Sequence, residues 1–126
     1  MKIDDTRPIW IQLSEEFTRR IVSGEWAIGS KIPSVRDLAL EAGVNPNTVQ
    51  RALGAIDARG LTTTERTAGR FVTREEEAIT AARNELAVGA TDTFITAITA
   101  IGLEQAEVLA LLSTRWDDTA DTGGAQ

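Results

Sequence analysis

The sequence of 126 residues contains neither cysteine nor histidine. A chain without these residues has no disulfide framework, no thiol nucleophile, no histidine general base and no zinc site of the usual kind. Its carboxylates gather at expected helix starts such as Glu75 to Glu77, with neither a nucleophile nor a base arranged beside them. We therefore predict that the protein is not an enzyme and needs neither a metal nor a cofactor.

Long apolar segments are also missing. No apolar run approaches the roughly 20 residues of a membrane span, and the N-terminus lacks the basic-then-apolar pattern of a signal peptide. We expect a cytoplasmic protein without membrane contact. With 42% hydrophobic residues, the chain can form one compact domain and a small appendage.

The net charge of −6 is divided unevenly along the chain. Residues 1–74 contain 11 Lys and Arg against 9 Asp and Glu, a balance of +2, whereas residues 75–126 contain 2 against 10, a balance of −8. This distribution permits a front half that faces DNA. It also fits a neutral domain followed by an acidic, solvated helix.

The first periodic stretch is "RPIWIQLSEEFTRRIV", in which apolar residues recur every four positions from Ile9 to Ile21. This spacing predicts a helix with one apolar face. Pro8 suits the start of that helix, and Gly24 is a plausible stop.

The stretch "SVRDLALEAGVNPNTVQRAL" has the signals of two short helices joined by a tight turn. Ser34 can cap a helix over about residues 35–42, and Gly43 can adopt the left-handed conformation of the turn. Asn45 is a good N-cap for the second helix, and Pro46 suits its first position. The second helix then presents hydrogen-bonding side chains near its start, namely Asn47, Thr48, Gln50 and Arg51.

This arrangement is typical of a helix-turn-helix, whose second helix inserts its N-terminal end into the major groove of DNA. Asn and Gln amides pair with adenine, Arg with guanine or phosphate, and Thr with phosphate or a thymine methyl group. The same pattern fits an ordinary capped helix hairpin with a polar outer face.

A predicted β-hairpin favours the helix-turn-helix. Strands over residues 61–66 and 70–73 surround a tip at Ala68 and Gly69, and a hairpin in this place is a wing. Arg66 and Arg70 flank the tip, where they can approach a phosphate backbone or enter the minor groove. A plain surface hairpin with two arginines remains the alternative.

Together, "PIWIQL", "KIPSVRDLA", "GVNPNTVQRAL" and "GRFV" resemble the winged helix-turn-helix domain of the GntR family of bacterial transcription regulators, over nearly all of residues 7–73. The "VNPNTV" form and a tail of about fifty residues are most similar to the YtrA-type subfamily. The resemblance implies a mainly α fold of the α+β winged-helix type, with three helices and a β-hairpin wing. It also implies operator contacts from Arg36 in the "PSxR" motif and from the start of the second helix. The matching positions are Ser34, Arg36, Asn45, Asn47, Thr48 and Arg51.

Two positions depart from the family pattern. Many relatives have an arginine where this chain has Pro46, so the base contacts of that arginine do not carry over. The wing commonly reads Gly-x-Gly-Thr-Phe-Val, whereas this chain keeps only the second glycine, Gly69, and has Arg70 in place of the threonine. Arg66, Gly69 and Arg70 are still counted as candidate DNA-binding residues.

Beyond Glu75 the apolar residues follow a helical period across Gly89, which predicts one long helix or two nearly collinear ones. A last helix is expected from Glu104 to Trp116, and residues 117–126 are typical of a disordered tail. Two amphipathic helices cannot cover each other completely, so a second copy is the natural cover, although both helices can instead pack on their own winged domain. The residues expected in the dimer are Ile79, Leu86, Phe94, Ile98, Ile101, Val108 and Leu112.

The predicted organisation is a DNA-binding domain over residues 1–74, a dimerisation region over 75–116 and the tail. The favoured function is a transcription regulator, in particular a repressor, that binds an inverted-repeat operator in double-stranded DNA as a homodimer. A small-molecule effector is an additional option if it favours one spacing of the two DNA-binding helices. The alternative is a winged-helix module that contacts proteins, because a fold alone does not fix function.

Overall fold

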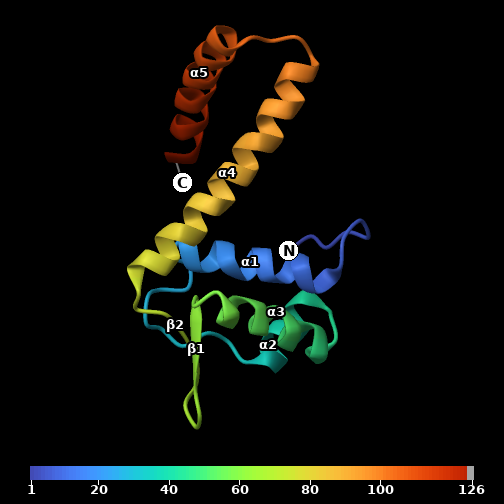
Figure 1. Ribbon diagram of the computed structural model, residues 1–126, viewed down its shortest axis with the longest axis vertical. Helices are drawn as coiled ribbons and strands as arrows, with labels where there is room; N and C mark the ends of the chain where they lie inside the picture. Colours follow the sequence, from blue (N-terminus) through green and yellow to red (C-terminus); the bar gives the residue numbers. More distant parts are fainter. Residues whose placement is uncertain (125–126) are drawn as a thin grey trace. The chain divides into compact units, whose positions relative to one another are not determined.

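A computed structural model describes the fold of residues 1–124 and the side-chain environments of residues 1–120. The described elements follow in the order α1 (Ile9–Val22), α2 (Val35–Ala42), α3 (Pro46–Ala58), β1 (Thr62–Glu65), β2 (Gly69–Val72), α4 (Glu76–Ala100) and α5 (Gln105–Gly124) (Figure 1). The chain divides into two compact units, Met1–Glu85 and Leu86–Gln126. The first unit has the expected mainly helical, α+β winged-helix fold, which is thereby confirmed.

The core of the first unit is built around α1. Leu13, Phe17 and Ile21, which recur every four residues, are almost completely buried. They form one apolar cluster with Leu38 of α2 and Leu53 of α3. Burial of each such side chain contributes roughly 1.5–3 kcal/mol to folding. The apolar face of α1 therefore supplies the platform against which α3 packs (Figure 1).

The two predicted short helices, α2 and α3, form with the expected signals at their ends. The Ser34 side chain accepts a hydrogen bond from the Asp37 N–H, and the Asn45 side chain accepts one from the Asn47 N–H. Gly43 between the helices has φ +68°, in the left-handed region that favours glycine. Pro46 occupies the first helical position, as predicted.

The hairpin β1–β2 is antiparallel, with Thr62 opposite Val72 and Glu65 opposite Gly69. The first strand is shorter than predicted, and the second has the predicted length but begins one residue earlier. The turn comprises residues 66–68, so Gly69 already belongs to β2. The segment 29–32 runs along the free edge of β2, where the N–H of Ile32 donates to the Arg70 carbonyl and Lys31 pairs with Phe71. The segment that precedes α2 therefore pairs with the outer edge of β2 and stabilises the base of the wing.

Helix α4 runs continuously through Gly89, so the region that the sequence left as one or two helices is one helix. Its first turns belong to the first unit, because Ile79 and Ala82 are buried in that core. The Arg83 guanidinium also donates to the Val22 carbonyl at the end of α1. Ile79 was expected at a dimer interface, and the structure corrects this assignment because its side chain is already covered by its own chain.

The second unit contains the rest of α4, a short connection and α5. Phe94, Ile98 and Val108 are half-buried, whereas Ile101 just after α4 is exposed. Helix α5 continues to Gly124, which corrects the prediction of a helix end at Trp116 and a disordered tail; residues 125 and 126 lie outside the described residues. Residues 117–122 contain no proline or glycine to end the helix, and the first glycines come at its last turn.

No single helix within the described residues is long and apolar enough to cross a membrane. The pair α4 and α5 meets the length and composition criteria only when both are taken together as a bent span.

Candidate nucleic-acid interface

The N-terminal part of α3 carries a group of polar side chains that the fold leaves unused. Asn47, Gln50 and Arg51 are exposed, and Thr48 is half-buried. Among the described residues, the side chains of Asn47, Thr48 and Gln50 make no hydrogen bond within the protein. Their donors and acceptors are therefore available to an external ligand.

Two predicted DNA-binding residues have a structural task of their own. The side-chain oxygens of Ser34 and Asn45 accept the capping hydrogen bonds, at 3.1 and 2.8 Å. The hydroxyl hydrogen of Ser34 and the amide NH₂ of Asn45 remain as donors. Both residues are exposed, so each can cap a helix and still donate outward.

Arg36 in the first turn of α2 is exposed and has no ion pair among the described residues. The same is true of Arg66 in the turn of the wing. Arg51 also lacks an acidic partner within the described part of the chain, but its guanidinium lies over the ring of Trp10, 4.3 Å from the ring centroid. Three elements of the first unit thus present uncompensated cations.

Several other arginines of the first unit are paired with carboxylates, although Arg74 and Arg83 have no carboxylate partner among the described residues. Arg7 pairs with Glu15, Arg59 with Glu85, and Arg19 with Glu16 and Glu25. The cations left without carboxylates therefore include those of α2, α3 and the wing turn, and these are the elements that approach DNA in a winged helix.

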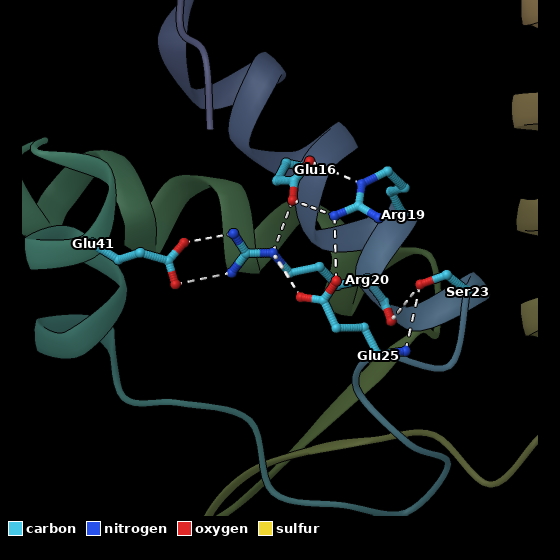
Figure 2. A network of polar contacts seen from close by, with 6 residues as sticks. All are labelled: Glu16, Arg19, Arg20, Ser23, Glu25 and Glu41. Atoms are coloured by element: carbon cyan, nitrogen blue, oxygen red, sulfur yellow. Dashed lines mark hydrogen bonds and ion pairs between the residues drawn. The ribbon is translucent and has the colours of Figure 1, made fainter. Parts of the chain in front are cut away.

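Arg20 organises a network that joins α1 to α2 (Figure 2). Its guanidinium is buried, donates to Glu41 of α2 at 3.2 and 2.5 Å, and donates to Glu16 at 2.9 Å. The hydrogen bond to Glu41 raises the Arg20 pKa above its ordinary value. The Arg20 guanidinium also lies over the rings of Phe17 and Trp26. These contacts fix the C-terminal part of α2 on α1, and with it the position of the helix-turn-helix.

Arg70 is placed differently from the other wing arginine. Its Nε lies 3.1 Å from Oδ1 of Asp57 and its Nη2 lies 3.0 Å from Oδ2, while the Thr62 hydroxyl donates to the same carboxylate. Arg70 is half-buried by this contact. We predicted it as a DNA contact, but the geometry makes it a link between the wing and the C-terminal end of α3, so Arg70 is not a free cation.

Two residues of this region have roles that the sequence did not reveal. The sequence pattern assigned no role to Trp10 or to Asp57. An acidic residue near a helix C-terminus is destabilised by the negative end of the helix dipole. The position of Asp57 in the last turn of α3 was therefore the one sequence signal that it has a cationic partner. No group of three or more acidic side chains in the described residues is arranged to hold a metal ion.

The sequence profile described as "Bacterial regulatory proteins, gntR family" matches residues 12–72, which include α1, the helix-turn-helix and the wing. A solved "GntR family transcriptional regulator from Listeria monocytogenes" is 30% identical, with a TM-score of 0.81 over 89% of this chain and 98% of that one. The chain belongs to the GntR family. It is a transcription regulator with a DNA-binding domain rather than an enzyme.

Two other relatives refine this placement. The chain is 34% identical over 65 residues to the "HTH-type transcriptional repressor YtrA" of Bacillus subtilis. The matched residues cover 52% of this chain and 50% of that protein. The DNA-binding domain of AraR, solved "in complex with operator ORR3", is 27% identical with a TM-score of 0.52 over 58% of this chain and 88% of that one. The expected GntR membership with YtrA among the relatives is confirmed.

Proposed function

We propose that this regulator binds an inverted-repeat operator in double-stranded DNA as a homodimer and represses transcription there. The observation that carries the proposal is the distribution of unpaired charge. Arg36, Arg51 and Arg66 lack carboxylate partners within the described residues. Several arginines on other surfaces of the first unit, such as Arg7 and Arg59, are paired with carboxylates. Cations without internal partners are suited to neutralise phosphates and to displace the counterions of DNA.

The direct reading of bases is assigned to α3. Asn47 and Gln50 present free amides, which pair bidentately with adenine, and Thr48 offers a hydroxyl and a methyl group. The relative AraR binds operator DNA through its own DNA-binding domain, which supports the same use of this domain here. Ser34 and Asn45 at the helix caps and Gly69 in the wing then lie close to the phosphate backbone. Contacts there help to fix the register of the protein on the duplex.

Dimerisation is assigned to the second unit. Within α5, Leu109, Leu112 and Trp116 lie at helical spacing on one face and are 58%, 39% and 73% exposed. Large apolar side chains left in water on one face indicate an interaction surface. Leu86, Phe94, Ile98, Ile101 and Val108 remain the other predicted members of the interface; two copies of one surface form a symmetric, isologous contact.

Binding to an operator within a promoter is sufficient for repression, because the bound protein blocks RNA polymerase. A relative is named as a repressor, which supports this direction. We place the protein in the cytoplasm, where its DNA would lie. A small-molecule effector would add regulation to this function if it bound one spacing of the two recognition helices more tightly than the other.

The test is selection of bound fragments from randomised duplexes by the purified full chain. We expect an enriched inverted repeat whose halves lie about 34 Å apart or a multiple of this spacing. Arg36→Ala should weaken binding to the selected site, and Asn47→Ala should lower discrimination between sites by about 1–3 kcal/mol. Transcription from a template that carries the site should fall when the protein is added.

Absence of any enriched sequence, together with equal binding to all duplexes, would remove the operator from the proposal. The second candidate, a winged-helix module for protein contacts, would then gain support. Enrichment of a single half-site would contradict the dimer and leave the DNA-binding function intact.

A further inference from the structure

We propose that Lys31 is the phosphate contact of the wing, in the place that the sequence pattern gives to Arg70. This inference rests on the proposed function and concerns which cation serves the wing. Lys31 lies outside both helices of the helix-turn-helix and outside the hairpin. It opens the "KIPSVRDLA" motif, but the sequence pattern assigned it no DNA contact. Its ligand is a phosphodiester group of the DNA backbone.

The fold carries Lys31 to the hairpin. Lys31 forms an antiparallel bridge with Phe71 of β2, and the neighbouring hydrogen bond from the Ile32 N–H to the Arg70 carbonyl is 3.0 Å long. Lys31 is thereby held by backbone pairing beside the hairpin, while Ser34 and the first turn of α2 follow only three residues later in the chain. It stands between two elements, the start of α2 and the wing.

The side chain of Lys31 points toward the tip of the wing. A methyl group built on Gly69 would lie 2.7 Å from Cε and 3.5 Å from Nζ of Lys31. The lysine stem therefore crosses directly over the Cα of Gly69, the first residue after the turn. Gly69 has φ +112°, so the position both needs glycine for its backbone and leaves room for the lysine.

The ammonium group has no internal counterion. Lys31 is exposed and makes no ion pair among the described residues, although Glu65 lies opposite Gly69 on β1. Arg70, by contrast, gives its planar guanidinium to both oxygens of Asp57. Near the tip, the unpaired cations of the described chain are then Lys31 and Arg66.

The chemistry of the two groups fits this division. A guanidinium group has a rigid, forked set of donors that can bind both oxygens of one carboxylate. Arg70 binds Asp57 in this way. An ammonium group is a compact point charge with rotatable donors, which suits a phosphate oxygen and does not depend on base identity. Lys31 is thus expected to add affinity at every DNA sequence.

The experiment measures binding of the full chain to a mixed-sequence duplex of about 30 base pairs, long enough for two half-sites, across a series of salt concentrations. Lys31→Met keeps the stem and removes the charge. For each bound protomer, the slope of log K against log salt should become shallower by about 0.9, and affinity near 0.1 M salt should fall roughly eightfold. Lys31→Arg should restore most of the slope.

Arg74→Met is the matched control. The Arg74 guanidinium lies against Gly29, at the far end of the same edge segment, and it too is exposed without an ion pair in the described part of the chain. It should change the slope much less than Lys31→Met. Thermal unfolding should be the same for both variants and the parent, since neither side chain is buried.

Each outcome decides the assignment. A shallower slope for Lys31→Met, recovered by Lys31→Arg, supports it. Unchanged binding by Lys31→Met overturns it while the parent still binds, and so does an equal loss in the two methionine variants, which would indicate a diffuse charge effect. If the parent binds no duplex at low salt, both this assignment and the proposed function fail.

Discussion

The guanidinium carbon of Arg51 lies 4.3 Å from the centroid of the Trp10 ring, so a residue of α1 touches the outer surface of α3. An arginine on an aromatic face loses some of its rotamers and keeps its edge donors free. Trp10 is therefore a positioning residue for a predicted DNA contact. It connects the first helix of the domain to the surface that reads DNA.

Trp10→Ala should weaken DNA binding without a large effect on folding. A cation–π contact at a partly exposed site contributes about 0.5–1 kcal/mol, which corresponds to a roughly two- to fivefold loss of affinity. Trp10→Phe should recover part of the loss. Fluorescence anisotropy with a labelled duplex measures the change.

The control is a double-mutant cycle with Arg51→Ala. In the Arg51→Ala background, Trp10→Ala should cost almost nothing in affinity, because the arginine that it orients is gone. Additive losses would instead indicate that Trp10 acts on binding by a separate route.

Arg70 and Asp57 lead to a second prediction, which concerns folding. Breaking a partly buried pair by Arg70→Ala leaves the Asp57 carboxylate with the Thr62 hydroxyl as its remaining side-chain donor. The free energy of unfolding should fall by about 1–3 kcal/mol. Urea unfolding followed by circular dichroism measures it.

Asp57→Ala separates this structural role from a direct DNA contact. It frees the Arg70 guanidinium, so DNA affinity should rise if Arg70 contacts phosphate. If the pair only ties the wing to α3, affinity should fall in both variants, and we expect this second result.

Much of this site follows from local sequence signals. Ser34, Gly43 and Pro46 predict the ends of α2 and α3 because caps, left-handed glycines and helix-initiating prolines act over a few residues. The partners of Arg70 and Arg51 could not be predicted in this way. Asp57 is 13 residues from Arg70, and Trp10 is farther still from Arg51, so these contacts depend on how α1, α3 and the wing pack.

The C-terminal part shows a different limit of sequence analysis. A helical period from Ile79 to Ile98 predicted one apolar face, but the same face is divided between two environments. Ile79 joins the core of the first unit, whereas Ile98 lies half-buried in the second. Periodicity identifies which residues share a face and contains no information on what covers each turn.

Glu16 gives a third prediction, on acid stability. Hydrogen bonding from Arg19 first, and then from Arg20, lowers the pKa of Glu16 to about 2 against an ordinary value of 4.5. Because the pKa is lower in the folded state, the stabilisation is complete above about pH 4.5 and is lost as the pH falls toward 2. The contribution is at most about 3 kcal/mol.

Glu16→Gln should therefore lower stability at pH 7 and flatten its dependence on pH between about 5 and 2. Unfolding curves at several pH values measure this. Glu15→Gln is the matched control, since its partner Arg7 is half-exposed and such pairs contribute about 0–1 kcal/mol. An unchanged pH profile in Glu16→Gln would contradict the assignment.

The fourth prediction concerns the exposed apolar face of α5. Leu112→Asp combined with Trp116→Asp places two charges on a surface that the proposed homodimer would bury, so the dimer should dissociate into monomers in sedimentation equilibrium. Neither side chain is buried within the described chain, and folding of the monomer should persist.

Ile28→Asp is the control, because Ile28 is 47% exposed but belongs to the first unit. It should leave the dimer intact. Monomers of the α5 variant should retain binding to a single half-site and lose the gain in affinity from two linked sites, which amounts to about 10²–10⁴. A dimer that persists with both charges in place would show that α5 is not at the interface. The contact would then have to lie on another surface, and the spacing of the selected half-sites would have to be explained from that surface instead.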